Sequence, residues 1–414
     1  MTSPLAPLLP ATVDHSLAGR RVAMVLFSFY PSDPRPRRVV ETMIRAGMEV
    51  DLICLSEEAP DHGAPGLRCT RLPIRHERGG KLSYAVNYFT FMAGAALLFG
   101  FRCLFRRYDL VYVHNMPDLL VVSALLPKLR GAKVILDLHD PMPELMMTIY
   151  GLGRDSLAVR CLTWFEKWSI ARVELAITVN EACRELFAAR SCPPQKIAVV
   201  MNSPDEAIFP LRPVSGCTRG AVSRWPFVIM YHGSLVERNG LDLAIEALDL
   251  VREQIEPVEL RIYGKRTPFL DRVLADAARR GLEGCVHYLG PRRLEDLAGE
   301  IARCDLGVIP NHRSAFAEIN TPTRIFEYLA LGKPVIAPRT KGILGYFDAS
   351  SLLLFEAGDA ASLAHAIRRA ATQPEQVRCL VDRGQKVYRS HQWTEERNTL
   401  LHLLSTLLNG GGTR

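Results

Sequence analysis

Continuous apolar runs recur along the first half of the chain, and amphipathic segments lie between most of them. A run of this kind is typical of a strand buried on both faces of a sheet. Because strands that alternate with helices form parallel sheets, the pattern predicts a doubly wound α/β domain. The predicted strands are 21–28, 50–55, 66–72, 110–114, 134–138, 175–179 and 197–201, and the first predicted helix is 38–45.

The composition changes after residue 203. Prolines and a glycine- and serine-containing run predict a linker at 204–225, after which the alternation restarts. The second half predicts a helix at 240–252 and strands at 227–231, 258–263, 286–289, 306–309, 335–337 and 352–354. We therefore expect a loose tail at 1–18 and two Rossmann-like domains, 19–203 and 226–391. Ligands bind at the carboxyl ends of such strands, so the cleft between the domains is the expected site.

Composition narrows the class of protein. The 414 residues are 48% apolar and 23% charged, with a formal net charge of +7. These values exclude a disordered chain, a fibre and a polytopic membrane protein. The ten cysteines contain no C-x-x-C pair, which favours reduced thiols in a cytoplasmic protein. The modest basic excess suits phosphate-bearing ligands or an anionic membrane face, and nothing indicates a nucleic-acid partner.

One apolar segment, within 82–107, raises the question of a membrane. Residues 82–101 carry no charge, but polar residues interrupt the first half, so the densely apolar part is only 88–101. That is too short to span a bilayer. A buried domain helix and a peripheral helix on an anionic membrane surface are both open. The basic flanking residues are Arg78, Lys81, Arg102, Arg106 and Arg107.

The strongest candidate for a ligand site is the segment Asn320-Thr-Pro-Thr-Arg-Ile-Phe-Glu-Tyr-Leu-Ala-Leu-Gly332. Thr321 is a good helix N-cap, and Pro322 suits the first helical position. The free amides of the first turn make an anion site, where Arg324 is favourable only if it shares the anion. Glu327 lies on the same face and offers a carboxylate for hydroxyl groups. The alternative is an ordinary capped helix with an ion pair between Arg324 and Glu327.

This segment and residues 231–248 resemble glycosyltransferase family 4, whose members are retaining sugar-nucleotide enzymes of the GT-B fold. Residues 108–114, 137–144 and 199–209 also resemble segments of the family, so the resemblance covers about 19–408. It implies two Rossmann-like domains facing across a cleft. It also implies that the last helix, 392–408, crosses back to the first domain, and that the second domain binds a nucleoside-diphosphate sugar.

The resemblance also implies donor-binding residues. Glu327 matches the second glutamate of the family's Glu-x7-Glu pattern, which binds the donor ribose. The first should fall at residue 319, which is Ile319, with Glu318 one position away. Either the loop is one residue longer here or that contact is missing.

The family's diphosphate-binding Arg and Lys align with Ser234 and Asn239, so Arg238 and Arg324 are inferred to supply the positive charge and act as catalytic residues. The other implied donor-binding residues are Gly233, Gly264, Arg266, Asn320, Thr321, Pro322 and Thr323.

Acceptor-side candidates follow strand ends in the first half. His139 and Asp140 end the 134–138 strand and are the predicted catalytic pair, in contact with the acceptor hydroxyl or the sugar. A structural histidine is the alternative. Basic side chains after the first strand suit a phosphate-bearing acceptor or are only a charged helix start. The weaker acceptor-side candidates are Asp33, Arg35, His114, Asp118 and Glu144.

No two aspartates are two residues apart, and the sequence shows no His/Cys metal cluster, so we expect neither a metal nor a cofactor beyond the donor. The predicted function is metal-independent hexosyl transfer, with retention, to a hydroxyl of a glycan or lipid-linked acceptor. Rival interpretations are a sugar-nucleotide epimerase, a phosphorylase or a catalytically silent binding subunit. A dinucleotide oxidoreductase is disfavoured because no strand precedes a G-x-G-x-x-G motif.

Overall fold

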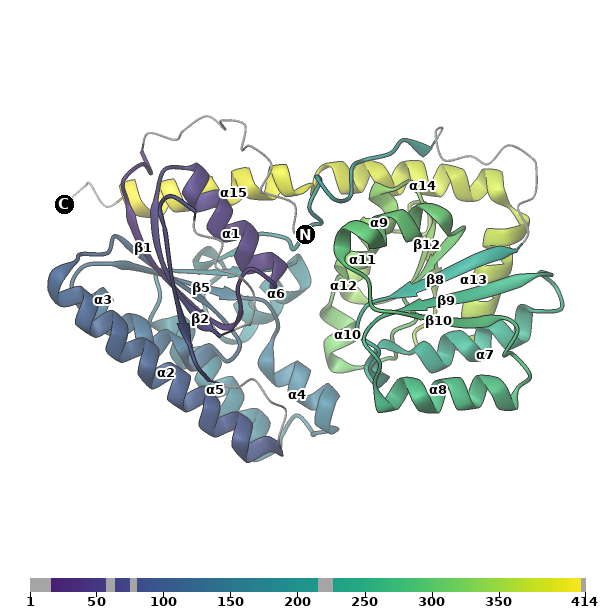
Figure 1. Cartoon of the computed structure of the whole chain (residues 1–414), viewed down its shortest axis with the longest axis horizontal. Helices are drawn as coiled ribbons and strands as arrows, with labels where there is room; N and C mark the ends of the chain where they lie inside the picture. The colour runs from purple at the N-terminus through teal and green to yellow at the C-terminus, as the bar shows by residue number, and fades with distance from the viewer. Residues whose placement is uncertain (1–15, 57–63, 75–79, 215–225, 411–414) are drawn as a thin grey trace.

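The computed structural model describes residues 16–56, 64–74, 80–214 and 226–410. Part of the predicted tail and linker, and Arg78, lie outside these ranges. Two parallel sheets, each covered by helices, make up two domains side by side (Figure 1). Each predicted strand is present to within two residues at either end, which confirms the predicted α/β fold.

The N-terminal domain holds a seven-stranded sheet of order β3-β2-β1-β4-β5-β6-β7. Its strands are β1 (Arg21–Phe29), β2 (Glu49–Leu55), β3 (Leu67–Leu72), β4 (Leu110–His114), β5 (Lys133–Leu138), β6 (Leu175–Thr178) and β7 (Ile197–Val199). Its helices are α1 (Pro34–Arg45), α2 (Gly80–Phe105), η1 (Asp118–Ala124), α3 (Leu125–Leu129), α4 (Met142–Tyr150), α5 (Leu157–Ala171), α6 (Glu181–Arg190) and η2 (Pro194–Lys196).

The C-terminal domain holds a six-stranded sheet of order β10-β9-β8-β11-β12-β13. Its strands are β8 (Phe227–His232), β9 (Val258–Tyr263), β10 (Val286–Gly290), β11 (Leu306–Val308), β12 (Val335–Pro338) and β13 (Leu353–Phe355). Its helices are η4 (Glu237–Asn239), α7 (Leu241–Val251), α8 (Pro268–Arg279), α9 (Leu294–Arg303), α10 (Ala315–Ile319), α11 (Thr323–Ala330), α12 (Lys341–Leu344), α13 (Ala360–Thr372) and α14 (Pro374–Arg389).

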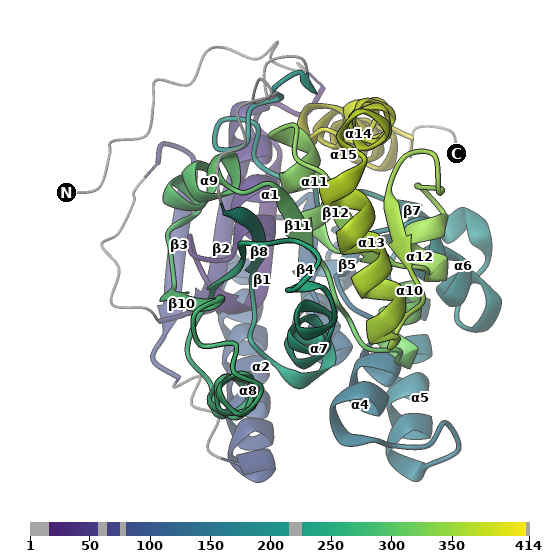
Figure 2. The ribbon, with the colours of Figure 1, turned by 90° about the vertical axis from the view of Figure 1, so that its right-hand side faces the viewer.

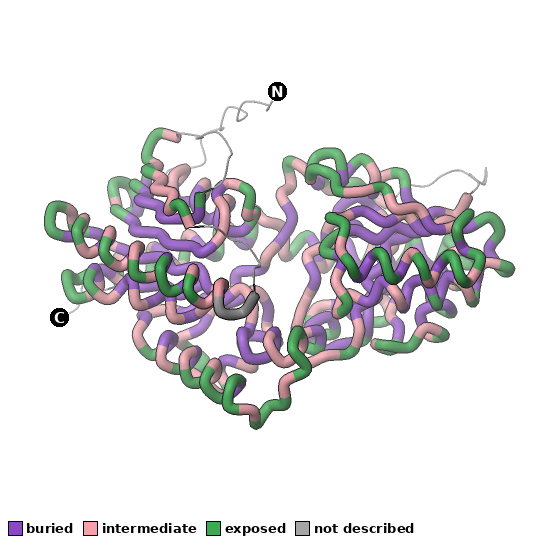
Figure 3. The backbone as a smooth tube through the Cα atoms, turned by 60° about the horizontal axis from the view of Figure 1, so that its bottom comes forward, coloured by how far each residue is buried: buried purple, intermediate pink, exposed green. Residues whose placement is uncertain are grey.

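The chain order places a topological switch point in each sheet. The sequence runs outward from β1 to β2 and β3 and then returns to β4; likewise it runs from β8 to β9 and β10 and returns to β11. Ligands bind in the crevice outside the strand ends at such points. The apolar strand residues are buried in both sheets, and the surrounding helices expose one side (Figure 3). The fold therefore directs the site to the ends of β1, β4, β8 and β11.

The first helix begins earlier than the sequence pattern predicts. Helix α1 starts at Pro34 rather than Arg38. Proline fits the first helical turn because its backbone nitrogen needs no partner there. Prolines 34 and 36 therefore begin the helix, although they interrupt the amphipathic pattern.

Helix α15 (Trp393–Asn409) leaves the C-terminal domain and packs on the N-terminal one (Figure 1, yellow). Leu400 and Leu404 are buried in the same apolar cluster as strand β1. The Glu396 carboxylate accepts a hydrogen bond from the Met201 backbone nitrogen at 2.7 Å. The crossing back of the last helix is thus confirmed.

Helix α2 is longer than the predicted apolar core of 88–101. Among the described helices it alone has the length and composition to cross a membrane. One side is buried against the domain and contributes Phe91, Ala95, Phe99 and Cys103 to the core. The opposite side leaves large apolar residues exposed, namely Val86, Phe89, Leu97, Phe101, Leu104 and Phe105. The helix is therefore a domain helix with an uncovered apolar face.

Candidate functional site

A cleft of about 1750 Å³ lies between the two domains. The N-terminal domain contributes Asp33, His114, His139 and Asp140 to its walls, and Arg238 lines it from the C-terminal domain. These residues follow strand ends, as expected for parallel sheets. The cleft therefore brings together predicted residues from both halves of the chain.

Asp137 organises the N-terminal wall. Strands β4 and β5 pair in parallel with His114 opposite Asp137. The fully buried Asp137 carboxylate accepts hydrogen bonds from Arg35 at 2.6 and 3.1 Å and from the Tyr112 hydroxyl at 2.9 Å. Burial alone would raise the pKa of Asp137, but the Arg35 guanidinium outweighs it and holds the pKa well below its usual range. Arg35 is thus used inside the domain and does not line the cleft.

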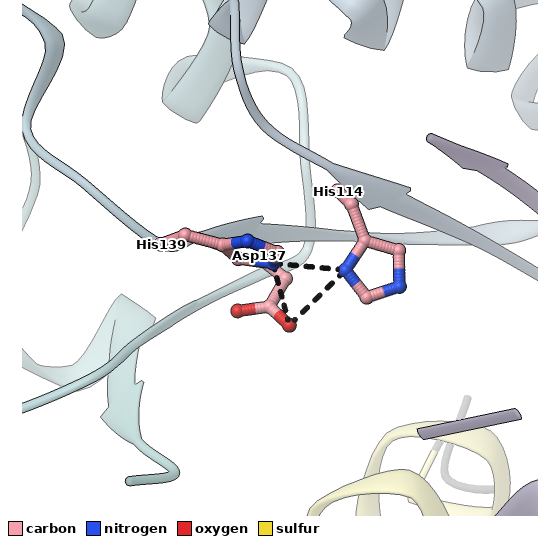
Figure 4. A group of neighbouring side chains, drawn as sticks. All are labelled: His114, Asp137 and His139. Atoms are coloured by element: carbon pink, nitrogen blue, oxygen red, sulfur yellow. Dashed lines mark hydrogen bonds and ion pairs between the residues drawn. The ribbon is translucent and has the colours of Figure 1, made fainter. Parts of the chain in front are cut away.

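Two histidines meet beside this carboxylate (Figure 4). His114 Nδ1 lies 3.0 Å from His139 Nε2, and each of these nitrogens is within 3.6 Å of an Asp137 oxygen. Burial lowers the pKa of His114 well below its usual value, so this ring is neutral at neutral pH. His139 is partly exposed and reaches the cleft. The network therefore fixes the orientation of the His139 ring.

Asn115, which the sequence did not single out, holds the turn after β5. Its Oδ1 accepts from the His139 backbone nitrogen at 2.8 Å, and its Nδ2 donates to the Asp140 carbonyl at 3.1 Å. The same Nδ2 donates to Asp118 Oδ1 at 2.9 Å. Burial raises the pKa of Asp118 to about 7, and this side chain supports Asn115 rather than lining the cleft. The only sequence signal for Asn115 was its position directly after a strand.

Asp140 and Arg238 face the cleft from opposite domains. Burial raises the pKa of Asp140, and the charges of His139 and Arg238 oppose that rise. A carboxylate, an imidazole and a guanidinium thus line the same cleft. Such a set can position a hydroxyl, move a proton and stabilise an anion.

The other acceptor-side candidate is turned away from the cleft. Both Glu144 oxygens accept hydrogen bonds from Arg190, at 2.6 and 3.0 Å. Arg190 also binds the buried Glu166. Glu144 lines a second pocket on the other side of α4.

On the C-terminal side, Arg324 lies against the end of β8. Its Nη1 donates to the His232 carbonyl at 2.6 Å, and its guanidinium lies 5.1 Å from the Tyr231 ring centre. Gly233 has a left-handed φ of 123°, and a Cβ there would come within 3.3 Å of Arg324 Nη1. A Cβ at Gly264 would lie 2.3 Å from the Gly233 carbonyl oxygen. Glycine at 233 therefore makes room for the arginine, and glycine at 264 allows the ends of β8 and β9 to approach each other closely.

Helix α11 begins one residue later than predicted. Pro322 occupies the N-cap position and Thr323 starts the helix, so the assignment of Thr321 as N-cap was wrong. The Thr321 hydroxyl donates instead to the Gly342 carbonyl at 2.7 Å. Asn320 ends the preceding helix α10, and the Thr323 hydroxyl donates to the Asn202 carbonyl at 2.8 Å. The Thr321 hydroxyl thus makes a tertiary contact instead of capping the helix. Arg324 still lies in the first turn, as predicted.

Glu327 does not form the ion pair with Arg324 that an ordinary capped helix would predict. Its Oε2 lies 3.3 Å from His232 Nε2, and no ion pair joins it to Arg324 within the described residues. Burial raises the pKa of Glu327 to about 7, although the charges of Arg324 and Arg38 lower it. Burial also lowers the pKa of His232 well below its usual value. The sequence missed His232, whose only signal was its place before Gly233.

The remaining donor-side candidates lie at the edges. Glu318 accepts from the Lys341 backbone nitrogen at 3.1 Å. Arg266 is largely exposed and pairs with Asp271 at 2.8 Å, whereas its neighbour Lys265 lines the cleft. In this arrangement Lys265 is better placed than Arg266 to meet a ligand in the cleft.

His114, Asp137 and His139 are also close enough, with ligand atoms within 4.8 Å of one another, to hold a metal ion. Sequence spacing could not show this cluster, because its members come from two strands. However, Arg35 already binds both Asp137 oxygens, and its buried positive charge opposes a cation. These three side chains therefore suit a hydrogen-bond network better than a metal centre.

Two families match the chain. The family described as "Glycosyl transferase 4-like domain" matches residues 33–203, and "Glycosyl transferases group 1" matches residues 226–373. The amylovoran biosynthesis glycosyltransferase AmsK of Erwinia amylovora is 28% identical over 48% of this chain and 48% of its own length. The chain spans about half the length of the curated relatives it matches.

Solved structures show the same fold. Sucrose-phosphate synthase from Thermosynechococcus elongatus has a TM-score of 0.75 and 18% identity, covering 95% of this chain and all of that one. Anabaena HepE in complex with UDP-glucose has a TM-score of 0.67 and 16% identity, covering 93% and 99%. The chain therefore has the GT-B fold; its first half is similar to the glycosyl transferase 4-like domain and its second half to the glycosyl transferases group 1 family.

Proposed function

We propose that the protein transfers a hexosyl group from a nucleoside-diphosphate sugar to an acceptor hydroxyl, with retention of anomeric configuration. The observation that carries the proposal is the meeting of His139 and Asp140 with Arg238 across one cleft. The two families and the UDP-glucose complex of HepE, a protein of the same fold, support it. AmsK is named for amylovoran biosynthesis, which supports a glycan or lipid-linked acceptor.

In this proposal the C-terminal domain holds the donor. Arg238, Arg324 and the amides at the start of α11 neutralise the diphosphate as it departs. Glu327 accepts hydrogen bonds from the ribose hydroxyls, and its buried Oε2, which lies 3.3 Å from His232 Nε2, has no hydrogen-bond partner among the described residues. Fixed charges and dipoles of this kind stabilise a leaving group without reorganising during the reaction.

The N-terminal domain would hold the acceptor. His139 and Asp140 position its hydroxyl against the anomeric carbon, and closure of the domains excludes water. The C–O bond to the acceptor forms on the face from which the diphosphate leaves, and a phosphate oxygen takes the hydroxyl proton. This front-face route needs no protein nucleophile.

Arg324→Ala should weaken nucleoside-diphosphate binding by about 10–100-fold, because a charge-assisted contact is worth about 1.5–3 kcal/mol. A thermal-shift panel of UDP, GDP, ADP and dTDP sugars first identifies the base, since a ligand of the folded state raises its Tm. Calorimetry then gives Kd. Arg279→Ala, on the exposed side of α8, is the matched control. An unchanged Kd for the Arg324 variant would remove this residue from the donor site.

Turnover should survive excess EDTA, because arginines and a helix start take the place of a metal at the diphosphate. The assay follows sugar transfer with and without chelator. A complete loss of transfer that Mn²⁺ or Mg²⁺ restores would show that the His114, Asp137 and His139 cluster, or another site, holds an essential ion.

The same assay separates the rival functions. An epimerase would convert the donor with no acceptor present, and a phosphorylase would require inorganic phosphate. A silent subunit would bind the nucleotide and never turn it over. Transfer that depends on an added glycan or lipid-linked acceptor supports the proposal.

We also propose that the uncovered face of α2 rests on an anionic membrane. Leu97 and Phe101 are 75% and 63% exposed, and Arg107 is exposed at the end of the helix. A basic residue near such a surface is worth about 1 kcal/mol, so binding should weaken with salt. The protein should co-sediment with phosphatidylglycerol vesicles and be released by added salt.

The variant Leu97→Ser/Phe101→Ser should lose most of this binding, whereas Leu250→Ser, which changes an exposed leucine of the other domain, should not. No co-sedimentation at low salt would leave α2 as a domain helix only.

A further inference from the structure

A second pocket, which no part of the proposed transfer uses, lies in the N-terminal domain. It measures about 500 Å³ and is formed by α4, α5 and α6. Its walls are mostly apolar and include Pro143, Met147, Val159, Leu186 and Ala189. Of these helices, α4 and α5 lie along the same lower side of the domain as α2 (Figures 1 and 2).

Basic side chains surround this apolar pocket. Arg154, Arg160 and Lys167 line it, all three are exposed, and none has an ion pair within the described part of the chain. Arg160 and Lys167 are seven residues apart on α5 and therefore share one helical face. The fourth base, Arg190, is already neutralised by Glu144 and Glu166. The pocket thus combines apolar walls with three positive charges that form no ion pair among the described residues.

Apolar groups are exposed beside the same charges. Trp164 lines the pocket between Arg160 and Lys167 and is 58% exposed, and Leu157, at the start of α5, is 76% exposed. An exposed tryptophan next to basic residues is typical of a surface that meets the boundary between lipid tails and headgroups. Free inorganic phosphate would not explain the apolar walls, and a neutral lipid would not explain the cations.

Helix α4 separates this pocket from the cleft. Pro143, Glu144 and Met147 line the pocket, whereas Leu145 and Met146 line the cleft. A helix with its side chains is about 10–12 Å across, so the two spaces lie one helix apart. A lipid whose phosphate sits at the rim can therefore extend a saccharide around α4 to His139 and Asp140.

We infer that the pocket between α4, α5 and α6 binds the phosphate and first apolar segment of a lipid phosphate, the carrier of the acceptor. The inference rests on the proposed transfer to a lipid-linked acceptor. Arg154, Arg160 and Lys167 contact the phosphate, and the apolar walls and Trp164 contact the chain. No bond is made or broken at this site.

Trp164 supplies the test. Farnesyl phosphate, kept below its critical micelle concentration, should change the tryptophan emission in a saturable way, and the change should be absent in Trp164→Phe. Farnesol and inorganic phosphate should have little effect. At about 1 kcal/mol for each basic residue, Arg160→Ala/Lys167→Ala should weaken binding by roughly 25-fold. Arg279→Ala/Lys386→Ala, on the other domain, should leave it unchanged.

Three results would overturn the inference: no change with farnesyl phosphate, an equal change with farnesol, or a change only with phosphatidylglycerol vesicles. The last would make the pocket a general membrane contact. Nucleotide-sugar binding, measured on the same protein, tests the transfer function separately. If the lipid response is missing while nucleotide-sugar binding is intact, only the inference about the pocket is wrong. If the lipid response is present while nucleotide-sugar binding is missing, the transferase proposal is wrong.

Discussion

Asp140→Asn should lower kcat by about 10²–10⁴-fold and leave nucleotide-sugar binding nearly unchanged. A decrease in kcat of this size is typical when a general base or a positioning group at the reacting centre is lost. Asp140 lines the cleft from the N-terminal domain, and the proposed donor residues lie in the other domain, so we expect its contact to belong mainly to the transition state. His139→Ala should show the same pattern, because its ring also reaches the cleft.

Glu327→Ala provides the opposite control. Its carboxylate lies in the C-terminal domain, 3.3 Å from His232, where we propose that the donor binds, so its loss should chiefly raise the Kd of the nucleotide sugar. Both constants are measured for all three variants. If the His139 and Asp140 variants keep near-normal turnover, the strand-end site is wrong and the loop 114–118 becomes the next candidate.

Asp137→Ala should destabilise the N-terminal domain by about 3–5 kcal/mol. The change leaves the buried Arg35 guanidinium without its partner, and an unpaired buried charge is far more costly than a lost surface contact. Asp109→Ala removes the partly exposed partner of Arg20 and should cost less than about 1 kcal/mol. Urea denaturation of both variants gives the comparison, and equal effects would contradict the role assigned to Asp137.

The pH dependence of this contribution follows from the sign of the shift. The pKa of Asp137 is lowered in the folded protein, so the stabilisation is fully present above the ordinary aspartate pKa of about 4. It is lost progressively as the pH falls below that value and through the lowered folded pKa. The difference between wild type and Asp137→Ala should therefore be constant from about pH 6 to pH 8.

The sequence determined the strands, their alternation with helices and the division into two domains. Apolar runs and turn residues are local features, so strands such as β5 could be placed to within a residue. The residues that follow strand ends were found for the same reason, because parallel strands direct His114, His139 and Gly233 to one edge of their sheets.

Only the tertiary structure decided which of these side chains face the cleft. Arg35 and Asp137 are 102 positions apart, and Arg324 and His232 are 92 apart, so neither pairing leaves a local pattern. The Thr321 hydroxyl donates to the distant Gly342 carbonyl instead of capping the helix, and α11 begins one residue later than predicted. The pocket between α4, α5 and α6 exists only because three helices pack together. Such contacts depend on the positions of whole elements, whereas the elements themselves depend on neighbouring residues.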